Sequence, residues 1–399
     1  MDYKFSDKMQ KLKPSAIREI FKSLSDPQMI SFAAGNPSPL SFPSKDLSEI
    51  SAEIYADPAS VTTALQYSIT EGYPLLREAL KNRMADKFSI GKDFDTTVVT
   101  SGGQQAIELA CKVLCNEGEA VICENPSFIG ALNAFRSCGV KPVGVELEDD
   151  GVNIDALEAA IKNTPKAKMI YLIPTFHNPA GITTSWEKRV KIYELAKKYS
   201  MPIFEDNPYG ELRFSGEYVA PIKTIDTEGL VIYCSSFSKI LSAGMRIGYV
   251  CAPDAIVQKM VVAKQSEDVH TNIFFQMLCY RYMTQKNMDA HIESIKELYG
   301  AKCGLMVKSI EEYFIDEIEF TRPGGGLFIW CKLPDSIPSS DFVKNAIAAK
   351  VAVVPGATFN CDETAPSQCF RLNYSTPSDE QIVSGIKALG DVARAMIKK

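Results

Sequence analysis

Short apolar segments alternate with amphipathic stretches through the first 250 residues of this 399-residue chain. In residues 154–161 and 186–198 the apolar side chains recur at the spacing of a helix. Strands that alternate with helices in this way form a mostly parallel sheet with helices on both faces, so the sequence predicts an α/β fold. The expected strands are centred near Val98, Val121, Ile170, Ile203, Val231 and Tyr249.

The length of the chain predicts more than one domain, because 399 residues exceed what a single hydrophobic core normally organises. After the strand region the pattern changes to long helices, and then to a shorter α/β segment that ends in a helix from Asp379. We therefore expect a large domain at residues 46–285 and a smaller α/β domain at 286–399. The N-terminal arm, residues 1–45, should pack against the small domain.

A lysine, Lys239, closely follows the apolar segment at residues 230–234. Burying an ammonium group without partners is unfavourable, so a lysine at the end of a buried strand usually has a chemical task. The hydroxyls of Ser236 and Ser238 and the guanidinium of Arg246 could hold a phosphate beside this amine. An imine-forming amine next to a phosphate site indicates pyridoxal phosphate (PLP). The alternative is a strand end with a solvated lysine.

Three other strand ends carry residues that suit the same cofactor. Asp206 follows a short apolar strand and could keep a pyridine nitrogen protonated, while Tyr209 could donate to a phenolic oxygen. Asn178 follows another strand and offers an amide to the same oxygen. Gly102 and Gly103 lie between a strand and a helix expected over residues 106–114, and glycines at such a junction let backbone amides at the start of the helix hold a phosphate. The alternatives are turn roles for Asp206 and Asn178.

Motifs along most of the chain resemble those of the fold-type-I PLP-dependent aminotransferases of class I/II. Within that family the sequence is most similar to the kynurenine/2-aminoadipate aminotransferase branch and to the aminotransferase domains of MocR-type regulators. The resemblance implies an aspartate aminotransferase-like fold. The motifs lie at residues 32–37, 65–68, 72–79, 101–105, 178–181, 205–209, 235–239, 242–248, 325–330 and 369–372.

The resemblance implies a role for each strand-end residue. Lys239 is expected to bind PLP as an imine and to move a proton between the substrate α-carbon and the cofactor. Asp206 pairs with the pyridine nitrogen, and Asn178 and Tyr209 bond the phenolic oxygen. Phe128 is the expected stacking residue, in a position where relatives often have Tyr or Trp. The expected phosphate ligands are Gly103, Gln104, Ser236, Ser238 and Arg246.

Further implied roles concern the substrate and a second subunit. Arg371 resembles the arginine that clamps the substrate α-carboxylate, a task that suits its planar fork. Gly35 and Asn178 are also expected beside the substrate. Tyr67 resembles the tyrosine that reaches the phosphate of the neighbouring subunit, which implies a homodimer with shared sites. Arg18 resembles an arginine over the side-chain pocket, although it could equally be an exposed helical residue.

Composition excludes several other classes of protein. The net charge is −6 and no basic stripe occurs, which argues against a nucleic-acid partner. The three histidines are far apart, so no metal site is expected. The eleven cysteines are scattered through apolar segments, as in reduced cytoplasmic proteins. No apolar run is long enough to span a membrane, and no signal peptide is evident.

The predicted activity is transfer of an amino group between an L-amino acid and a 2-oxo acid such as 2-oxoglutarate. The amino acid is expected to be aromatic, 2-aminoadipate-like or similar. A PLP-dependent C–S lyase or an enzyme like aminocyclopropane-carboxylate synthase remains an alternative. A non-catalytic ligand-sensing domain is less favoured, because the resemblance begins near Pro14 and leaves no room for a preceding DNA-binding domain.

Overall fold

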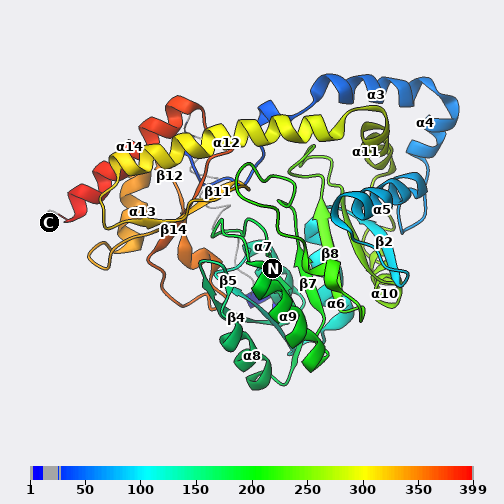
Figure 1. Cartoon of the computed structure of the whole chain (residues 1–399), viewed down its shortest axis with the longest axis horizontal. Coiled ribbons are helices and arrows are strands. Elements are labelled where there is room, and N and C mark those ends of the chain that lie inside the picture. The colour runs from blue at the N-terminus through cyan, green and yellow to red at the C-terminus, as the bar shows by residue number, and fades with distance from the viewer. Residues whose placement is uncertain (1–2, 12–25, 27, 398–399) are drawn as a thin grey trace.

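An eight-stranded sheet forms the centre of the computed structural model, which describes residues 3–11, 26 and 28–397 (Figure 1). Its strand order is β2-β9-β8-β7-β6-β3-β4-β5. All six strands expected from the sequence are present in it. The strands are β2 (Asp95–Thr100), β9 (Gly248–Pro253), β8 (Val231–Ser236), β7 (Ile203–Asp206), β6 (Ala167–Leu172), β3 (Ala120–Asn125), β4 (Lys141–Glu148) and β5 (Gly151–Val152).

Most of this sheet is parallel, as predicted. Strands β8, β7, β6, β3 and β4 pair in parallel, whereas β9 runs antiparallel to both of its neighbours, β8 and β2. The sequence did not indicate β4 and β5, which lie at one edge. Only Val145 is buried in β4, so this strand lacks the apolar pattern that identifies the strands predicted from the sequence.

Helices cover both faces of the sheet and bury two separate apolar clusters. One cluster includes Leu109, Leu132 and Val257, and the other includes Leu157 and Ile192. The helices of the first face are α6 (Gly103–Leu114), α7 (Ile129–Ser137) and α10 (Asp254–Gln265), and those of the second are α8 (Ile154–Asn163) and α9 (Trp186–Tyr199).

The long helix α12 runs along the top of Figure 1. The strands that follow it in the sequence form a second, four-stranded antiparallel sheet with the order β10-β11-β14-β13. The predicted boundary at residues 285/286 falls between α11 and α12, and a division into domains at this point stays a prediction. The elements are α11 (Ile273–Gln285), α12 (Met288–Tyr313), β10 (Glu319–Phe320), β11 (Phe328–Lys332), α13 (Ser339–Ala348), β13 (Val354–Pro355), η3 (Gly356–Phe359), β14 (Cys369–Asn373) and α14 (Asp379–Ile397).

The N-terminal segment crosses between the two sheets. Strand β1 (Ile30–Ser31) pairs in parallel with β12 (Val351–Ala352), and the buried Phe32 accepts a hydrogen bond from the Asn373 amide. The short helix α1 (Asp7–Lys11) lies instead near α7 and the large sheet, where Lys8 pairs with Glu117. The elements that follow β1 are η1 (Pro39–Ser41), α3 (Ser44–Ala56), α4 (Pro58–Leu65) and α5 (Pro74–Phe88).

Among the described residues, no helix combines the length and the apolar composition needed to cross a bilayer.

A buried lysine joins the two strands β2 and β8 at the edge opposite their carboxyl ends. Lys223, in η2 (Ile222–Ile225), lies with its Nζ 2.7 Å from an Asp95 carboxylate oxygen and 2.9 Å from one of Asp226. Its side chain is fully buried. Removing one member of a buried ion pair leaves a charge without compensation.

We therefore expect Lys223→Ala to reduce the free energy of unfolding by about 3–5 kcal/mol, because Asp95 and Asp226 would lose their cation. Urea denaturation would measure this change. Lys197→Ala is the matched control, since Lys197 pairs with Glu228 at the exposed surface and should contribute little. Equal effects of the two substitutions would show that the Lys223 cluster does not stabilise the fold.

Candidate active site

The predicted site residues line one cavity at the carboxyl ends of β2, β3, β6, β7 and β8. Its volume is about 360 Å³. A larger groove of about 1100 Å³ runs beside α12 and contains none of these residues. The predicted residues that line the cavity are Gly35, Gly103, Gln104, Phe128, Asn178, Asp206, Tyr209, Ser236, Ser238, Lys239, Arg246 and Arg371.

Lys239 follows β8 and lines this cavity. Its Nζ donates a hydrogen bond to the carbonyl oxygen of Gly35 at 2.8 Å. Loss of hydration, together with the positive charges of Arg371 and Arg246, lowers the Lys239 pKa to about 8. A substantial fraction of this amine is therefore neutral near physiological pH, as a nucleophile or a base requires.

Arg371 lies in β14 of the second sheet and is 2% exposed. Its Nη1 donates to Asn178 Oδ1 at 2.7 Å, and its Nη2 donates to the Ala33 carbonyl at 2.8 Å. The guanidinium carbon lies 4.1 Å from the centre of the Phe328 ring. Nε is buried and has no hydrogen-bond partner among the described residues. Burial lowers the Arg371 pKa to about 10, so the group remains a cation that could bind a carboxylate.

A cradle suited to an anion lies where α6 begins, and it includes Gly103, Ser236, Ser238 and Arg246, which line the same cavity. Gly102 has φ +79°, and a Cβ atom there would lie within 2.2 Å of the Arg246 guanidinium. The absence of a side chain leaves the first amides of α6 open to an anion. Ser236 donates to Ser238 between hydroxyls 2.8 Å apart, and Arg246 Nη1 reaches Ser238 at 3.4 Å.

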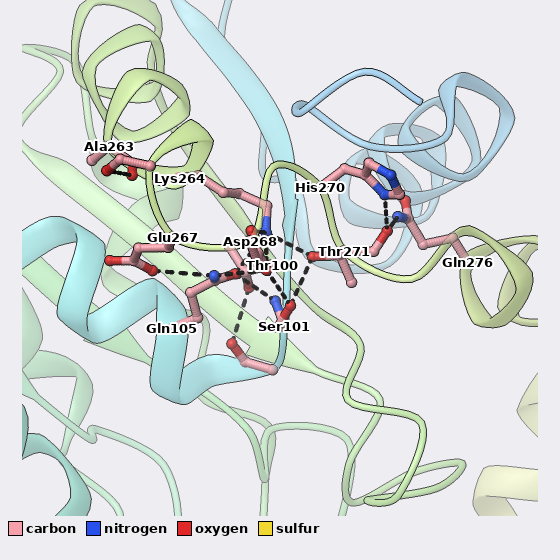
Figure 2. A network of polar contacts seen from close by, with 12 residues as sticks. Thr100, Ser101, Gln105, Ala263, Lys264, Glu267, Asp268, His270, Thr271 and Gln276 are labelled. Atoms are coloured by element: carbon pink, nitrogen blue, oxygen red, sulfur yellow. Dashed lines mark hydrogen bonds and ion pairs between the residues drawn. The ribbon is translucent and has the colours of Figure 1, made fainter. Parts of the chain in front are cut away.

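A buried network holds this end of α6 in place (Figure 2). The Lys264 ammonium lies 2.8 Å from both carboxylate oxygens of Asp268 and donates to Gln105 at 2.7 Å and to Thr271 at 2.9 Å. The Ser101 hydroxyl donates to the same carboxylate at 2.7 Å, while the Ser101 amide donates to Gln105. The cradle therefore rests on a polar cluster whose charges are paired.

Asp206 ends β7 on the floor of the cavity and is 5% exposed. Burial raises its pKa to about 6; the hydrogen bond from the Tyr171 hydroxyl opposes this rise, and the negative charge of Glu124 adds to it. Asp206 is mostly ionised at neutral pH. Tyr209 lies nearby, and burial raises its pKa as well. The sequence indicated neither Tyr171 nor Glu124, because both lie within apolar strands that resemble ordinary core segments.

These surroundings fit pyridoxal phosphate. The cavity contains a partly buried amine, a carboxylate suited to a cationic ring nitrogen, and a cradle suited to an anion. The guanidinium of Arg371, which also lines the cavity, adds a cation suited to a second anion.

Two predicted residues lie elsewhere. Tyr67 is 80% exposed and packs edge-to-face on His270, with ring centroids 5.8 Å apart, so it does not reach the cavity of its own chain. Arg18 lies outside the described residues.

Comparisons with known proteins agree with this site. The family model "Aminotransferase class I and II" matches residues 27–389. Aromatic-amino-acid aminotransferase 1 of Thermococcus litoralis is 40% identical over 405 aligned positions, covering 100% of this chain and 96% of that protein.

Two solved structures show the same fold. Pyrococcus horikoshii kynurenine aminotransferase, in complex with PMP, superimposes with a TM-score of 0.95 at 36% identity, covering 99% of this chain and 98% of that one. The α-aminoadipate aminotransferase LysN of Thermus thermophilus, complexed with N-(5'-phosphopyridoxyl)-L-leucine, gives 0.89 at 31% identity with the same coverages. The expected fold and cofactor are thereby confirmed. The chain belongs to the class I and II aminotransferases and is a PLP-dependent enzyme of that family.

Proposed function

We propose that this aminotransferase exchanges the amino group between an aromatic or 2-aminoadipate-like L-amino acid and a 2-oxo acid such as 2-oxoglutarate. The observation that carries the proposal is the buried Arg371, a guanidinium that lines the cavity and has no carboxylate partner among the described residues. Aromatic rings from Phe328, Phe128 and Tyr209 line the space around it and suit an apolar or aromatic side chain. The names of the aromatic-amino-acid, kynurenine and α-aminoadipate relatives support this choice.

When bound, PLP supplies an electron sink for negative charge at the substrate α-carbon. In our proposal Lys239 would hold the cofactor through Nζ, and the same amine would act as the base that takes the proton from the substrate α-carbon. Arg371 holds the α-carboxylate and thereby orients the α C–H bond toward Nζ. Asp206 balances the positive charge on the ring nitrogen, as a fixed anion in a dry site can.

The remaining residues position the cofactor. Asn178 Oδ1 accepts a hydrogen bond from Arg371, and the side-chain amide of Asn178 also interacts with the Tyr209 hydroxyl. The amide nitrogen of Asn178 and the Tyr209 hydroxyl would therefore donate together to the phenolic oxygen. Phe128 would pack against the ring, and Gly35, whose carbonyl holds Lys239, lies on the substrate side. The phosphate would be bound by Gly103, Gln104, Ser236, Ser238 and Arg246.

We also propose a homodimer in which Tyr67 completes the phosphate site of the partner. Tyr67 and its neighbours Leu65 and Ile69 are 80%, 70% and 48% exposed, and Tyr55 on α3 is 56% exposed. Clustered exposed apolar side chains are typical of an interaction surface. Sedimentation should show a dimer at micromolar concentration. In Tyr67→Phe PLP retention should weaken without unfolding, whereas Tyr55→Phe should retain PLP normally; a fully active monomer would contradict the proposal.

A cytoplasmic location completes the proposal. Several cysteines, among them Cys234 and Cys251, lie buried in the central sheet as free thiols, and this suits a reducing compartment.

The role of Lys239 predicts a spectroscopic change. Purified protein should be yellow, and Lys239→Ala should lose the imine absorbance because no other amine replaces Nζ. The variant can retain PLP without a covalent bond, since the cradle and Asp206 are unchanged. Lys286→Ala, which removes a lysine paired with Asp46 and Glu49 on the surface, is the control. An unchanged imine spectrum in Lys239→Ala would contradict the assignment.

The role of Arg371 predicts selective loss of amino acids as substrates. Truncation to Ala should lower kcat/KM for an amino acid. The expected loss of transition-state stabilisation is about 2–5 kcal/mol, the range for removing one partner of a buried charge pair. Arg371→Lys should also weaken binding, because the planar fork is lost. For an amine that lacks the carboxylate, kcat/KM should be nearly the same in the variants as in wild type. The control is Arg322→Ala, whose side chain is 60% exposed and pairs with Glu311.

A panel of amino donors with 2-oxoglutarate as acceptor tests the reaction itself. Formation of glutamate from aromatic amino acids or 2-aminoadipate is the expected result. Release of ammonia, or of a cyclopropane product, would instead favour the lyase or synthase alternative. If Arg371→Ala penalises amine and amino acid equally, Arg371 is structural and the substrate need not be an α-amino acid.

A further inference from the structure

The two carboxylate oxygens of Asp206 have different surroundings. Oδ2 accepts a hydrogen bond from the Tyr171 hydroxyl, with 2.7 Å between the two oxygens. Oδ1 lies on the side of Gly103, 4.0 Å from the point where a Cβ atom on that glycine would stand, and Gly103 lines the cavity. One oxygen is thus bound within the protein interior, and the other is turned toward the cavity.

The Tyr171 ring is fixed and fully buried. It stacks on Phe204 at a centroid distance of 5.8 Å and meets the edge of Phe135 at 5.5 Å. A phenylalanine would make the same ring contacts, so packing does not require the hydroxyl. A buried hydroxyl without a partner is unfavourable, and that of Tyr171 is directed at Asp206.

A second buried carboxylate lies close to this pair. Glu124 is 1% exposed, accepts the Ile173 amide hydrogen at 2.8 Å, and lies 3.2 Å from Nε2 of His177. Nδ1 of His177 accepts a hydrogen bond from the Ala180 amide, and Nε2 has no hydrogen-bond partner among the described residues. The negative charge of Glu124 opposes ionisation of Asp206.

We propose that Tyr171 is a positioning residue whose hydrogen bond keeps Asp206 ionised and turns Oδ1 toward the pyridine nitrogen of PLP. This role rests on the proposed function, in which Asp206 pairs with that nitrogen. Tyr171 acts through Asp206 and holds the oxygen that the cofactor does not use.

The proposal has a defined sign for the pH dependence of cofactor binding. The titratable groups that face Asp206 are Tyr171 on β6, Glu124 on β3, Cys234 on β8 and Tyr209 after β7. Burial raises the Asp206 pKa to about 6, and the Tyr171 hydroxyl limits that rise. Without the hydroxyl the pKa is higher, so more of the carboxyl is protonated near neutral pH. Affinity for PLP falls as the pH drops through the Asp206 pKa. In a protein that lacks the Tyr171 hydroxyl, this fall should therefore occur at a higher pH than in wild type.

The test is a titration of the apoprotein with PLP from about pH 5 to pH 8, followed by protein fluorescence, in wild type and Tyr171→Phe. We expect the midpoint of the pH dependence to move upward by about one unit and the affinity near that midpoint to fall by up to about tenfold. Tyr233→Phe is the control, because Tyr233 is equally buried but accepts its hydrogen bond from Asn207 at 3.0 Å. Its midpoint should equal that of wild type.

Two further measurements separate positioning from packing. A PLP analogue with carbon in place of the ring nitrogen should bind wild type and Tyr171→Phe equally, because it makes no bond to Asp206. Glu124→Gln should move the midpoint downward, in the direction opposite to Tyr171→Phe. This variant provides the measurement if Tyr171→Phe does not fold.

The outcomes are distinguishable. Wild-type apoprotein that fails to bind PLP would overturn the proposed function itself. Normal PLP binding with the same midpoint in Tyr171→Phe, or an equal loss of affinity for PLP and for the carbon analogue, would overturn the role of Tyr171 alone. If only Glu124→Gln folds, an unchanged midpoint in that variant would be the contradicting result.

Discussion

Parallel pairing of the central strands is the constraint on which the rest of this structure depends. Because β3, β6, β7 and β8 run in the same direction, their carboxyl ends meet at one edge of the sheet. Phe128, Asn178, Asp206 and Lys239 follow these four ends and are far apart in sequence, yet they line one cavity. Backbone hydrogen bonds set the register of the strands, so they fix the points at which the segments that carry these side chains begin.

Buried charges distinguish the site from the scaffold. Lys223 and Lys264 are buried cations; Lys223 has two carboxylates within 3 Å, and Lys264 has one. Lys239 has a carbonyl as its hydrogen-bond acceptor among the described residues, and Arg371 has a carbonyl and an amide oxygen. Charges without counter-ions are unfavourable in a dry interior, so bound anions should stabilise the protein by mass action. The buried lysines of the scaffold are thus paired within the protein, whereas the cations of the cavity would be paired by the anions that bind there.

The sequence predicted those features that depend on local pattern. The six central strands and the polar residues at their ends were identified because an apolar run followed by Lys, Asp or Asn is visible in one segment. Tyr171 was missed because its partner, Asp206, lies on the neighbouring strand. The pairing of β6 with β7 depends on the tertiary structure and cannot be seen in either segment alone. Strand β4 was missed because too few of its side chains are buried to show an apolar pattern. The role of Tyr67 requires a second chain and stays a prediction.

Arg371 has a consequence for selectivity. Its guanidinium is already oriented by Asn178 from the large sheet and by Ala33 from the N-terminal segment, so little reorganisation is needed when a carboxylate arrives. Every α-amino acid presents the same carboxylate, and this preformed contact therefore adds nearly the same free energy to the binding of each. An interaction common to all candidates cannot discriminate between them. Choice among amino acids must arise where side chains differ, along the aromatic wall that includes Phe328, and a few substitutions there could change the preferred substrate while leaving the chemistry intact.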